Sequence, residues 1–272
     1  MLATAYVISF LGMIVLPVLF GIYLLRKFRL SWKLLLAGGL TFIVSQVLHI
    51  PLLSGLTALF KNGTLSSPPA AWATLFNAVL LGLLAGVFEE TARYILFKFA
   101  LKQARTWDEG LLVGVGHGGT EAVIIGILAG LAFVNMVVYR NIDLSTVPSI
   151  PADQLALAKQ QVAAYWSAPV YMAFMGLIER VFAMCLHLAL SVMVLYSIVS
   201  KKPVWFWLAL LWHAVVDGTA VYLAPKIGIL AVEGIVAVMA ILSLWILFSL
   251  RQKFPPQPIA SIAEDETGVA IA

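Results

Sequence analysis

Four apolar stretches of the sequence carry ionisable side chains in short, regularly spaced groups. Residues three or four apart, and those two turns apart, lie on one face of a helix, so each group can present its side chains to one site. The groups are Glu89, Glu90 and Arg93; His117 and Glu121; Glu179, Arg180 and His187; and His213 with Asp217. Ionisable side chains are costly to bury in apolar surroundings, so their repetition points to chemistry.

Imidazoles and carboxylates in such a set can hydrolyse a bond in two ways. They can hold Zn²⁺ and leave one position for water, whose pKa the metal lowers. Alternatively, a glutamate can activate water directly while histidine and aspartate donate to the developing oxyanion. The residue types leave both mechanisms open.

Composition identifies the kind of chain that must position these groups. Only 11% of its 272 residues are charged and 62% are hydrophobic, whereas about 25% of a soluble domain is charged. The fold class is therefore all-α and polytopic, with the lipid bilayer as a partner and no nucleic acid. The single cysteine, Cys185, excludes an internal disulfide and a cysteine-rich metal site.

Seven apolar runs are long enough to span a membrane, which takes about 20 residues. They cover residues 3–25, 32–53, 72–98, 108–138, 168–199, 203–224 and 227–250. We expect one transmembrane domain over 1–254, with a short interfacial helix in the connection at 140–167. The Pro-rich and then acidic segment 255–272 is expected to be a disordered cytoplasmic tail.

Basic residues predict the orientation of the seven helices. Strict alternation places eleven lysines and arginines on one side and four on the other. The eleven are Arg26, Lys27, Arg29, Lys33, Lys98, Lys102, Arg105, Lys201, Lys202, Arg251 and Lys253. Because cytoplasmic loops are enriched in basic residues, we expect a cell-membrane protein with its N-terminus outside and its C-terminus in the cytoplasm.

The four groups are expected to share one depth in the membrane. Counted from the cytoplasmic end at about 1.5 Å per residue, their carboxylates and imidazoles lie about 13–21 Å in, near the middle of a core about 30 Å thick. A single buried histidine more often makes an interhelical hydrogen bond, and Glu beside Arg often forms a structural ion pair. The shared depth favours a common site. His49 and Glu233 lie nearer the outer face, and local roles are expected for them.

Glycines surround His117 in the string "GVGHGGTEAVIIGILAG". A phosphate-binding loop would need a strand before it, and none is expected in this apolar run. Small residues in a membrane helix instead allow neighbouring helices to approach closely. We therefore interpret these glycines as scaffolding.

Taken in order, "EETAR", "GHGGTE", "ERVFAMCLH" and "HAVVD" resemble the motifs of the YhfC family of membrane peptidases. That family is similar to the group of CAAX prenyl endopeptidases, bacteriocin-immunity proteases and PrsW-type proteases. The resemblance covers about residues 72–224, as a four-helix catalytic-type core. The helices at 3–25, 32–53 and 227–250 would then be accessory.

The resemblance implies a role for each group. A glutamate of the first motif, Glu89 or Glu90, is implied to activate water, with a slight preference for Glu89. The implied metal ligands or oxyanion donors are His117, His187 and His213, with zinc as the metal if one is bound. Asp217 completes the catalytic set, and the implied supporting residues are Arg93, Glu121, Glu179 and Arg180. Whether His117 or Glu121 contacts the reacting groups stays open.

The favoured function is proteolysis within the membrane, at a site reached from the cytoplasm, with a peptide or transmembrane protein as substrate. Two other functions stay open. One is a non-catalytic scaffold or binding subunit that uses the polar cluster to hold a partner helix. The other is a proton- or metal-coupled transporter, since buried histidines and glutamates also form relays.

Overall fold

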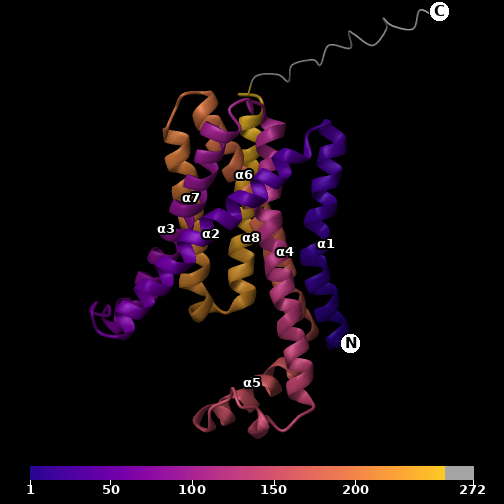
Figure 1. The fold of residues 1–272 in the computed structure, drawn as a ribbon, viewed down its shortest axis with the longest axis vertical. Helices are drawn as coiled ribbons and strands as arrows, with labels where there is room; N and C mark the ends of the chain where they lie inside the picture. Colours follow the sequence, from indigo (N-terminus) through magenta and orange to yellow (C-terminus); the bar gives the residue numbers. More distant parts are fainter. Residues whose placement is uncertain (255–272) are drawn as a thin grey trace, which may run out of the picture.

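The computed structural model describes residues 1–254. This part of the chain consists of helices and short loops and contains no strand (Figure 1). The long helices are α1 (Leu2–Phe28), α2 (Trp32–Lys61), α3 (Ala70–Ile95), α4 (Trp107–Arg140), α6 (Met175–Val199), α7 (Val204–Ile227) and α8 (Ile229–Arg251). These seven are long and apolar enough to cross a membrane. The predicted all-α polytopic membrane fold is confirmed, and the predicted tail at 255–272 lies outside the described residues.

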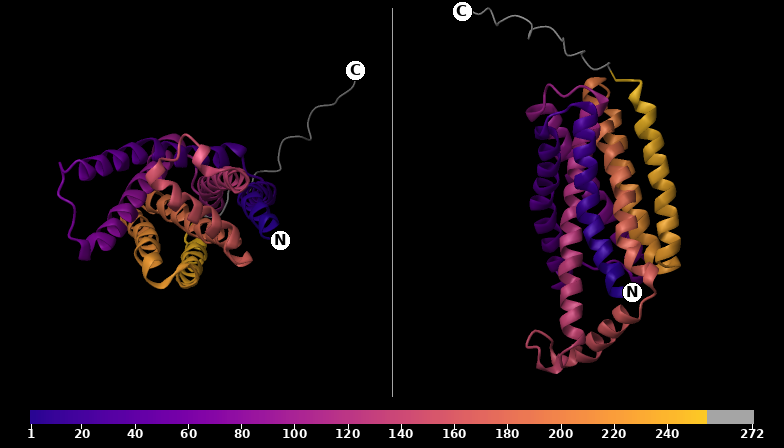
Figure 2. Two further views of the ribbon diagram at one scale, coloured as in Figure 1. Left: turned by 90° about the horizontal axis from the view of Figure 1, so that it is seen from below. Right: turned by 90° about the vertical axis from the view of Figure 1, so that its right-hand side faces the viewer.

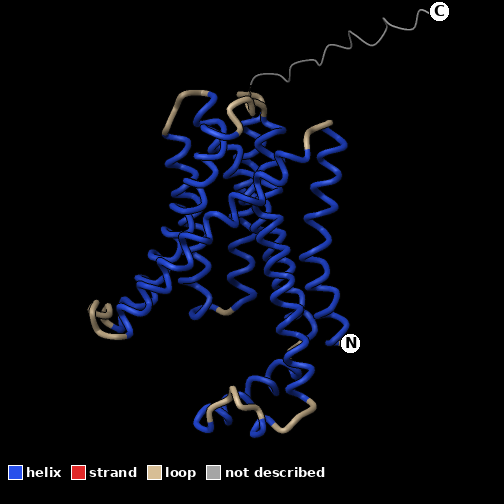
Figure 3. Tube along the Cα trace, in the orientation of Figure 1, coloured by secondary structure: helices blue, strands red, loops and turns tan. Residues whose placement is uncertain are grey.

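Short helices complete the connections between the long ones. They are the π-helical turn η1 (Leu96–Ala100), the 3₁₀ helices η2 (Leu144–Thr146), η3 (Ala152–Gln154) and η4 (Val170–Phe174), and the α-helix α5 (Leu155–Ser167). Loops gather at the two ends of the bundle (Figure 3). We call these the N-terminal end, where residue 1 lies, and the C-terminal end, where α8 stops (Figure 1). The eleven basic residues belong to the C-terminal end, and its assignment to the cytoplasm stays a prediction.

The short helix α5 lies beyond the N-terminal end of the bundle, below α4 in Figure 1. The ring of Tyr165 stacks on that of Tyr6 in α1, with centroids 4.3 Å apart. Trp166 Nε1 donates a hydrogen bond of 3.0 Å to the carbonyl oxygen of Met136. Burial raises the pKa of the Tyr165 hydroxyl to about 12. Tyrosine and tryptophan anchors of this kind are enriched at membrane surfaces, which agrees with the predicted interfacial helix.

Apolar side chains fill the half of the bundle near the C-terminal end. The second half of α6 is enclosed by α4, α7 and α8, and Leu190 and Leu195 are fully buried there. Leu112 and Val113 of α4 and Leu250 of α8 are fully buried in the same core. Seen end-on, the helices group closely except for the connection between α2 and α3, which projects to one side (Figure 2).

A capping box fixes where α4 begins. The Thr106 side chain accepts from the backbone N–H of Glu109, and the Glu109 carboxylate accepts from the backbone N–H of Thr106. This arrangement satisfies two N–H groups at the start of the helix. His117 follows ten residues after Trp107, so its position about 15 Å along the helix is fixed by the cap.

Glycines let α2 cross α4 at very short range. A Cβ atom added at Gly38 would overlap the carbonyl oxygen of Val113, and one added at Gly116 would overlap that of Leu35. The two backbones touch because neither glycine has a side chain. This contact confirms the interpretation of the glycines near His117 as scaffolding. It also brings polar side chains of α2 close to α4.

Replacing Gly38 with alanine is expected to lower the melting temperature, because the new methyl group would overlap the backbone of α4. Overpacking of this kind costs about 1–3 kcal/mol. Thermal unfolding of the purified protein in detergent, followed by loss of helical circular dichroism, measures the effect. The matched control is Gly55→Ala in the same helix, where an added Cβ meets no described atom within 4 Å. Equal melting temperatures for the two variants would contradict the close crossing.

Candidate functional site

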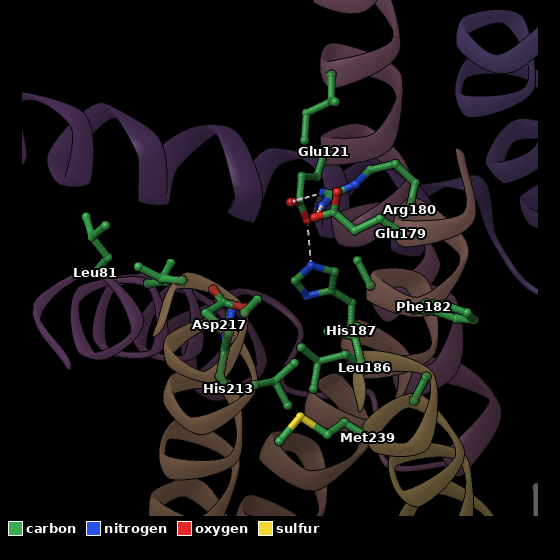
Figure 4. Close-up of a pocket in the computed structure, with 18 of the residues that line it drawn as sticks. Leu81, Glu121, Glu179, Arg180, Phe182, Leu186, His187, His213, Asp217 and Met239 are labelled. Carbon is green, nitrogen blue, oxygen red and sulfur yellow. Dashed lines mark hydrogen bonds and ion pairs between the residues drawn. The ribbon is translucent and has the colours of Figure 1, made fainter. Parts of the chain in front are cut away.

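The four sequence motifs come together in the middle of the bundle. The ring centroids of His117 and His187 are 5.2 Å apart, and those of His187 and His213 are 5.6 Å apart. All three histidines are buried. Figure 4 shows His187 between Glu121 on one side and the His213–Asp217 pair on the other. The predicted convergence of α3, α4, α6 and α7 at one depth is therefore present.

The two consecutive glutamates of α3 point in different directions. Glu89 lines a cavity, and its Oε2 lies 2.9 Å from Nε2 of His117. Glu90 is fully enclosed, and its Oε1 lies 2.7 Å from Nδ1 of His213. Consecutive residues are about 100° apart around a helix, so only one of the two can face the cavity. Glu89 is that residue.

The guanidinium group of Arg93 lies between the carboxylates of α3 and a histidine of α6. It is fully buried and donates to the Oε1 of Glu90. Its Nη2 lies 2.7 Å from Nδ1 of His187 and 3.8 Å from Oε2 of Glu89. Because a guanidinium group only donates, Nδ1 of His187 must accept. The proton of this imidazole is therefore on Nε2.

A second ion-pair cluster holds His187 from the other side. The Nε2–H of His187 donates to Oε2 of Glu121 at 2.6 Å. Arg180 donates to Oε1 of Glu121 at 2.5 Å and to Oε1 of Glu179 at 2.6 Å (Figure 4). His117 contacts Glu89, whereas Glu121 contacts His187 and lines the cavity, so which of the two contacts the reacting groups stays open.

Helix α2 contributes contacts to Glu89 and His117 that were not predicted. Gln46 Nε2 donates to Oε1 of Glu89 at 3.1 Å, and Oγ1 of Thr41 lies 2.8 Å from Nδ1 of His117. This helix had been expected to be accessory. Thr41, Ser45 and His49 recur every four residues along it. That spacing was the available signal, and it was weak because hydroxyl side chains are common in membrane helices.

Thr41 also determines which nitrogen of His117 carries a proton. Its hydroxyl donates to the carbonyl oxygen of Gly38 at 2.6 Å, so the same hydroxyl oxygen accepts from Nδ1–H of His117. Nε2 of His117 is then unprotonated in the neutral ring and faces the carboxylate of Glu89 at 2.9 Å. Two acceptors in contact require a positive charge between them, either a proton or a metal ion.

The donor set is suitable for a metal ion. One ligand atom each from Glu89, His117 and His187 lies within 4.8 Å of the others, and all three residues are buried. Two imidazoles and a carboxylate are a known ligand set for Zn²⁺. Because both nitrogens of His187 are engaged, an ion bound to it has to replace its contact with Arg93 or with Glu121.

This compact set differs in one member from the three histidines expected as ligands. Glu89 takes the place of His213, whose Nε2 lies 3.9 Å from Oε2 of Glu89 and 3.4 Å from Oδ2 of Asp217. His213 therefore sits beside the set and faces the cavity together with Asp217 (Figure 4).

A cavity of about 620 Å³ leads from the cluster toward the N-terminal end. Along α7 it is lined from His213 to Ala224, and along α8 from Ile229 to Ser243. The half on the other side of His213 is the apolar core described above. We expected access from the cytoplasmic side, which by the count of basic residues is the C-terminal end. The cavity instead lies on the opposite side of the cluster.

His49 and Glu233, expected to have local roles nearer the outer face, both line this cavity. The ring of His49 stacks on Phe88 with centroids 5.5 Å apart. Neither ring nitrogen of His49 has a hydrogen-bond partner among residues 1–254, and the same holds for Oε2 of Glu233. Both side chains therefore place buried polar atoms without a described partner at the wall of the cavity.

Comparison with known proteins agrees with this geometry. The sequence model of a family described as "YhfC intramembrane metalloprotease" matches residues 12–253. The chain belongs to the YhfC family. It is also 31% identical over 261 residues to the "Uncharacterized membrane protein YhfC" of Bacillus subtilis (strain 168), covering 93% of this chain and 96% of that protein. No solved structure matches it.

The resemblance to the YhfC family is thereby confirmed, and it extends further than the four motifs. The matched range begins within α1 and ends after α8, so it includes α2 and α8. These two helices supply Thr41, Gln46 and Glu233 to the cluster and its cavity. The family match therefore covers the helices that had been expected to be accessory.

Replacing Arg93 with methionine is expected to destabilise the protein by about 3–5 kcal/mol, because Glu90 would lose its buried cation. Adding Glu90→Gln to this variant removes the unpaired charge and should recover part of the loss. Unfolding by denaturant in detergent measures both effects. The control is Arg26→Met at an exposed position near the end of α1, where a change within about 0.5 kcal/mol is expected. Similar losses for Arg93→Met and Arg26→Met would show that the buried contacts add nothing.

Proposed function

We propose that this chain is an intramembrane metalloprotease, which hydrolyses a peptide bond at the cluster in the middle of the bundle. The observation that carries the proposal is the approach of ligand atoms from Glu89, His117 and His187 within 4.8 Å, at the inner end of a cavity. The description of the matched family supports it. A divalent ion such as Zn²⁺, when bound, supplies Lewis acidity to water and to the peptide carbonyl.

His117, His187 and Glu89 would hold the ion. Contacts with neighbouring residues fix the orientation of both rings: His117 donates to the hydroxyl of Thr41, and His187 to the carboxylate of Glu121. Such outer contacts fix the tautomer of a ligating histidine and raise its basicity. Their presence supports a metal site more strongly than the three ligand residues alone.

His213 has the geometry of a general base. Its Nδ1–H donates to Glu90, which Arg93 holds in place, so Nε2 is the nitrogen that would exchange a proton with substrate groups. Nε2 would take the proton of the attacking water and later deliver it to the nitrogen of the leaving amine. Asp217, 3.4 Å from Nε2, would stabilise the charged imidazole. Glu89 had been preferred as the base, but both of its oxygens are engaged, by His117 and Gln46.

The cavity is suited to an apolar peptide segment. Leu81, Phe182 and Met239 contribute apolar surface to it, and His187 and His213 lie at its inner end (Figure 4). An extended backbone could therefore enter from the N-terminal end and present a carbonyl group to the cluster. By the count of basic residues this end faces the outside of the cell membrane, and the C-terminus lies in the cytoplasm.

Purified protein is expected to contain about one equivalent of a divalent ion per chain. His117→Ala and Glu89→Gln should lose the ion and all cleavage, because each removes a ligand. His213→Gln should keep the ion and lose cleavage, because it removes only the base. Mass spectrometry measures both the metal content and the products from a library of transmembrane-segment peptides.

The opposite pattern is equally informative. Loss of the ion in His213→Gln together with its retention in Glu89→Gln would instead support the three-histidine set. Cleavage by metal-stripped protein would favour direct activation of water by a glutamate. Full cleavage by all three variants would exclude hydrolysis at this cluster, whereas no cleavage by the wild-type protein would favour a scaffold or transport function.

Thr41→Val is expected to weaken binding of Zn²⁺ about tenfold, because His117 would lose the contact that fixes its tautomer. Competition with a fluorescent chelator in detergent measures the affinity. The matched control is Thr41→Ser, which keeps the hydroxyl and should bind Zn²⁺ as the wild type does. Wild-type affinity in Thr41→Val would show that this hydroxyl does not position His117.

A further inference from the structure

Glu233 of α8 is a buried carboxylate whose charge is not matched. It is 7% exposed, it lines the cavity, and its Oε2 has no hydrogen-bond partner in the described part of the chain. Burial of a carboxylate without a partner is costly, so such a group is stable only when a cation or a proton accompanies it. The side chain therefore marks a place that a cation or a proton from outside the described chain has to neutralise.

The neighbouring charges do not supply that cation. Glu233 lies within electrostatic range of Glu179 and Arg180. Arg180 is already bound between Glu121 and Glu179, at 2.5 Å and 2.6 Å. Glu179, which also lines the cavity, adds a second negative charge, and its side chain is 46% exposed. The pair Glu179 and Glu233 thus forms an acidic site with no free cation among the residues described.

The whole cavity has the same imbalance. One arginine lines it, Arg180. The carboxylates that line it are Glu89, Glu121, Glu179, Asp217 and Glu233. A metal ion at Glu89 would neutralise the inner end only. The excess of negative charge then lies between the cluster and the N-terminal end, on the path that a substrate would take.

We propose that Glu179 and Glu233 form a subsite for a cationic group of the substrate: the side-chain ammonium or guanidinium of a basic residue, or a free N-terminal ammonium. This inference rests on the proposed function to the extent that the substrate is a peptide. A charge-assisted hydrogen bond to the cation would satisfy the free oxygen of Glu233. The cavity would then select a segment that is apolar except for one basic group.

The helix geometry gives the distance of that group from the cleaved bond. Glu179 and His187 are eight residues apart on α6, about 12 Å along its axis. An extended peptide advances about 3.3 Å per residue, so this distance corresponds to three or four residues. The basic group is expected three or four residues from the peptide bond that lies against the cluster.

Peptide binding tests the subsite without relying on cleavage. The probe is a short fluorescent leucine–alanine peptide with one lysine, compared with the same peptide carrying norleucine at that position. Binding is measured by fluorescence anisotropy on full-length protein in detergent, with His213→Gln present throughout so that the peptide stays intact. The lysine peptide is expected to bind about tenfold more tightly, the gain of one charge-assisted contact.

Substituting Glu233 by glutamine should reduce this preference to less than about twofold. The matched control is Asp153→Asn, which removes one carboxylate from an exposed position in the 141–174 connection and should keep the full preference. Acetylating the N-terminus of the norleucine peptide tests the other source of charge: about tenfold weaker binding after acetylation, seen with Glu233 and lost in Glu233→Gln, identifies the N-terminal ammonium as the bound group.

Three results would overturn the subsite: equal binding of the lysine and norleucine peptides together with no effect of N-terminal acetylation, a preference for the charged group that survives Glu233→Gln, or no measurable binding of any of the peptides. The proposed function fails differently, through the absence of cleavage by wild-type protein. A lysine preference that depends on Glu233 in a protein that cleaves nothing would uphold the subsite and reject the protease.

Discussion

The buried guanidinium group of Arg93 is the contact on which the arrangement of the cluster depends. A charge at this depth is stable only if its donors are met by acceptors. Glu90 on the same helix and His187 on α6 accept from its two terminal nitrogens, and Glu90 also holds His213 of α7. One charge therefore ties three helices together. It fixes the proton positions on two histidines as well, which is a chemical consequence of a structural ion pair.

The motifs and their common depth could be predicted from the sequence, because each follows from a regular property of the α-helix. Helical spacing puts His213 and Asp217 on one face, and the rise per residue puts them level with Glu89 and His117. These four side chains do lie close together in the structure. The number of spanning helices followed in the same way from the length of the apolar runs.

Contacts set by the rotation and tilt of whole helices could not be predicted. The depth of the two glutamates along α3 does not determine that Glu89 rather than Glu90 faces the cavity, because that depends on how α3 is rotated against α7. Thr41 and Gln46 were missed because their contribution depends on the close crossing of α2 and α4 at Gly38. The side of the cluster on which the cavity opens depends on which half of α6 is enclosed. Glu179 and Arg180 lie in its open half, and this signal was interpreted only as support for the site.

The filled half of the bundle also has an electrical consequence. Water and ions in the cavity would carry the potential of the N-terminal side down to His213, so any membrane voltage would fall across the apolar layer around Leu190 and Leu250. A proton moving between cavity water and His213 would then cross almost none of the field. The layer would then act as an insulator, which would keep the proposed chemistry of the cluster independent of the membrane potential and close the path for a proton leak.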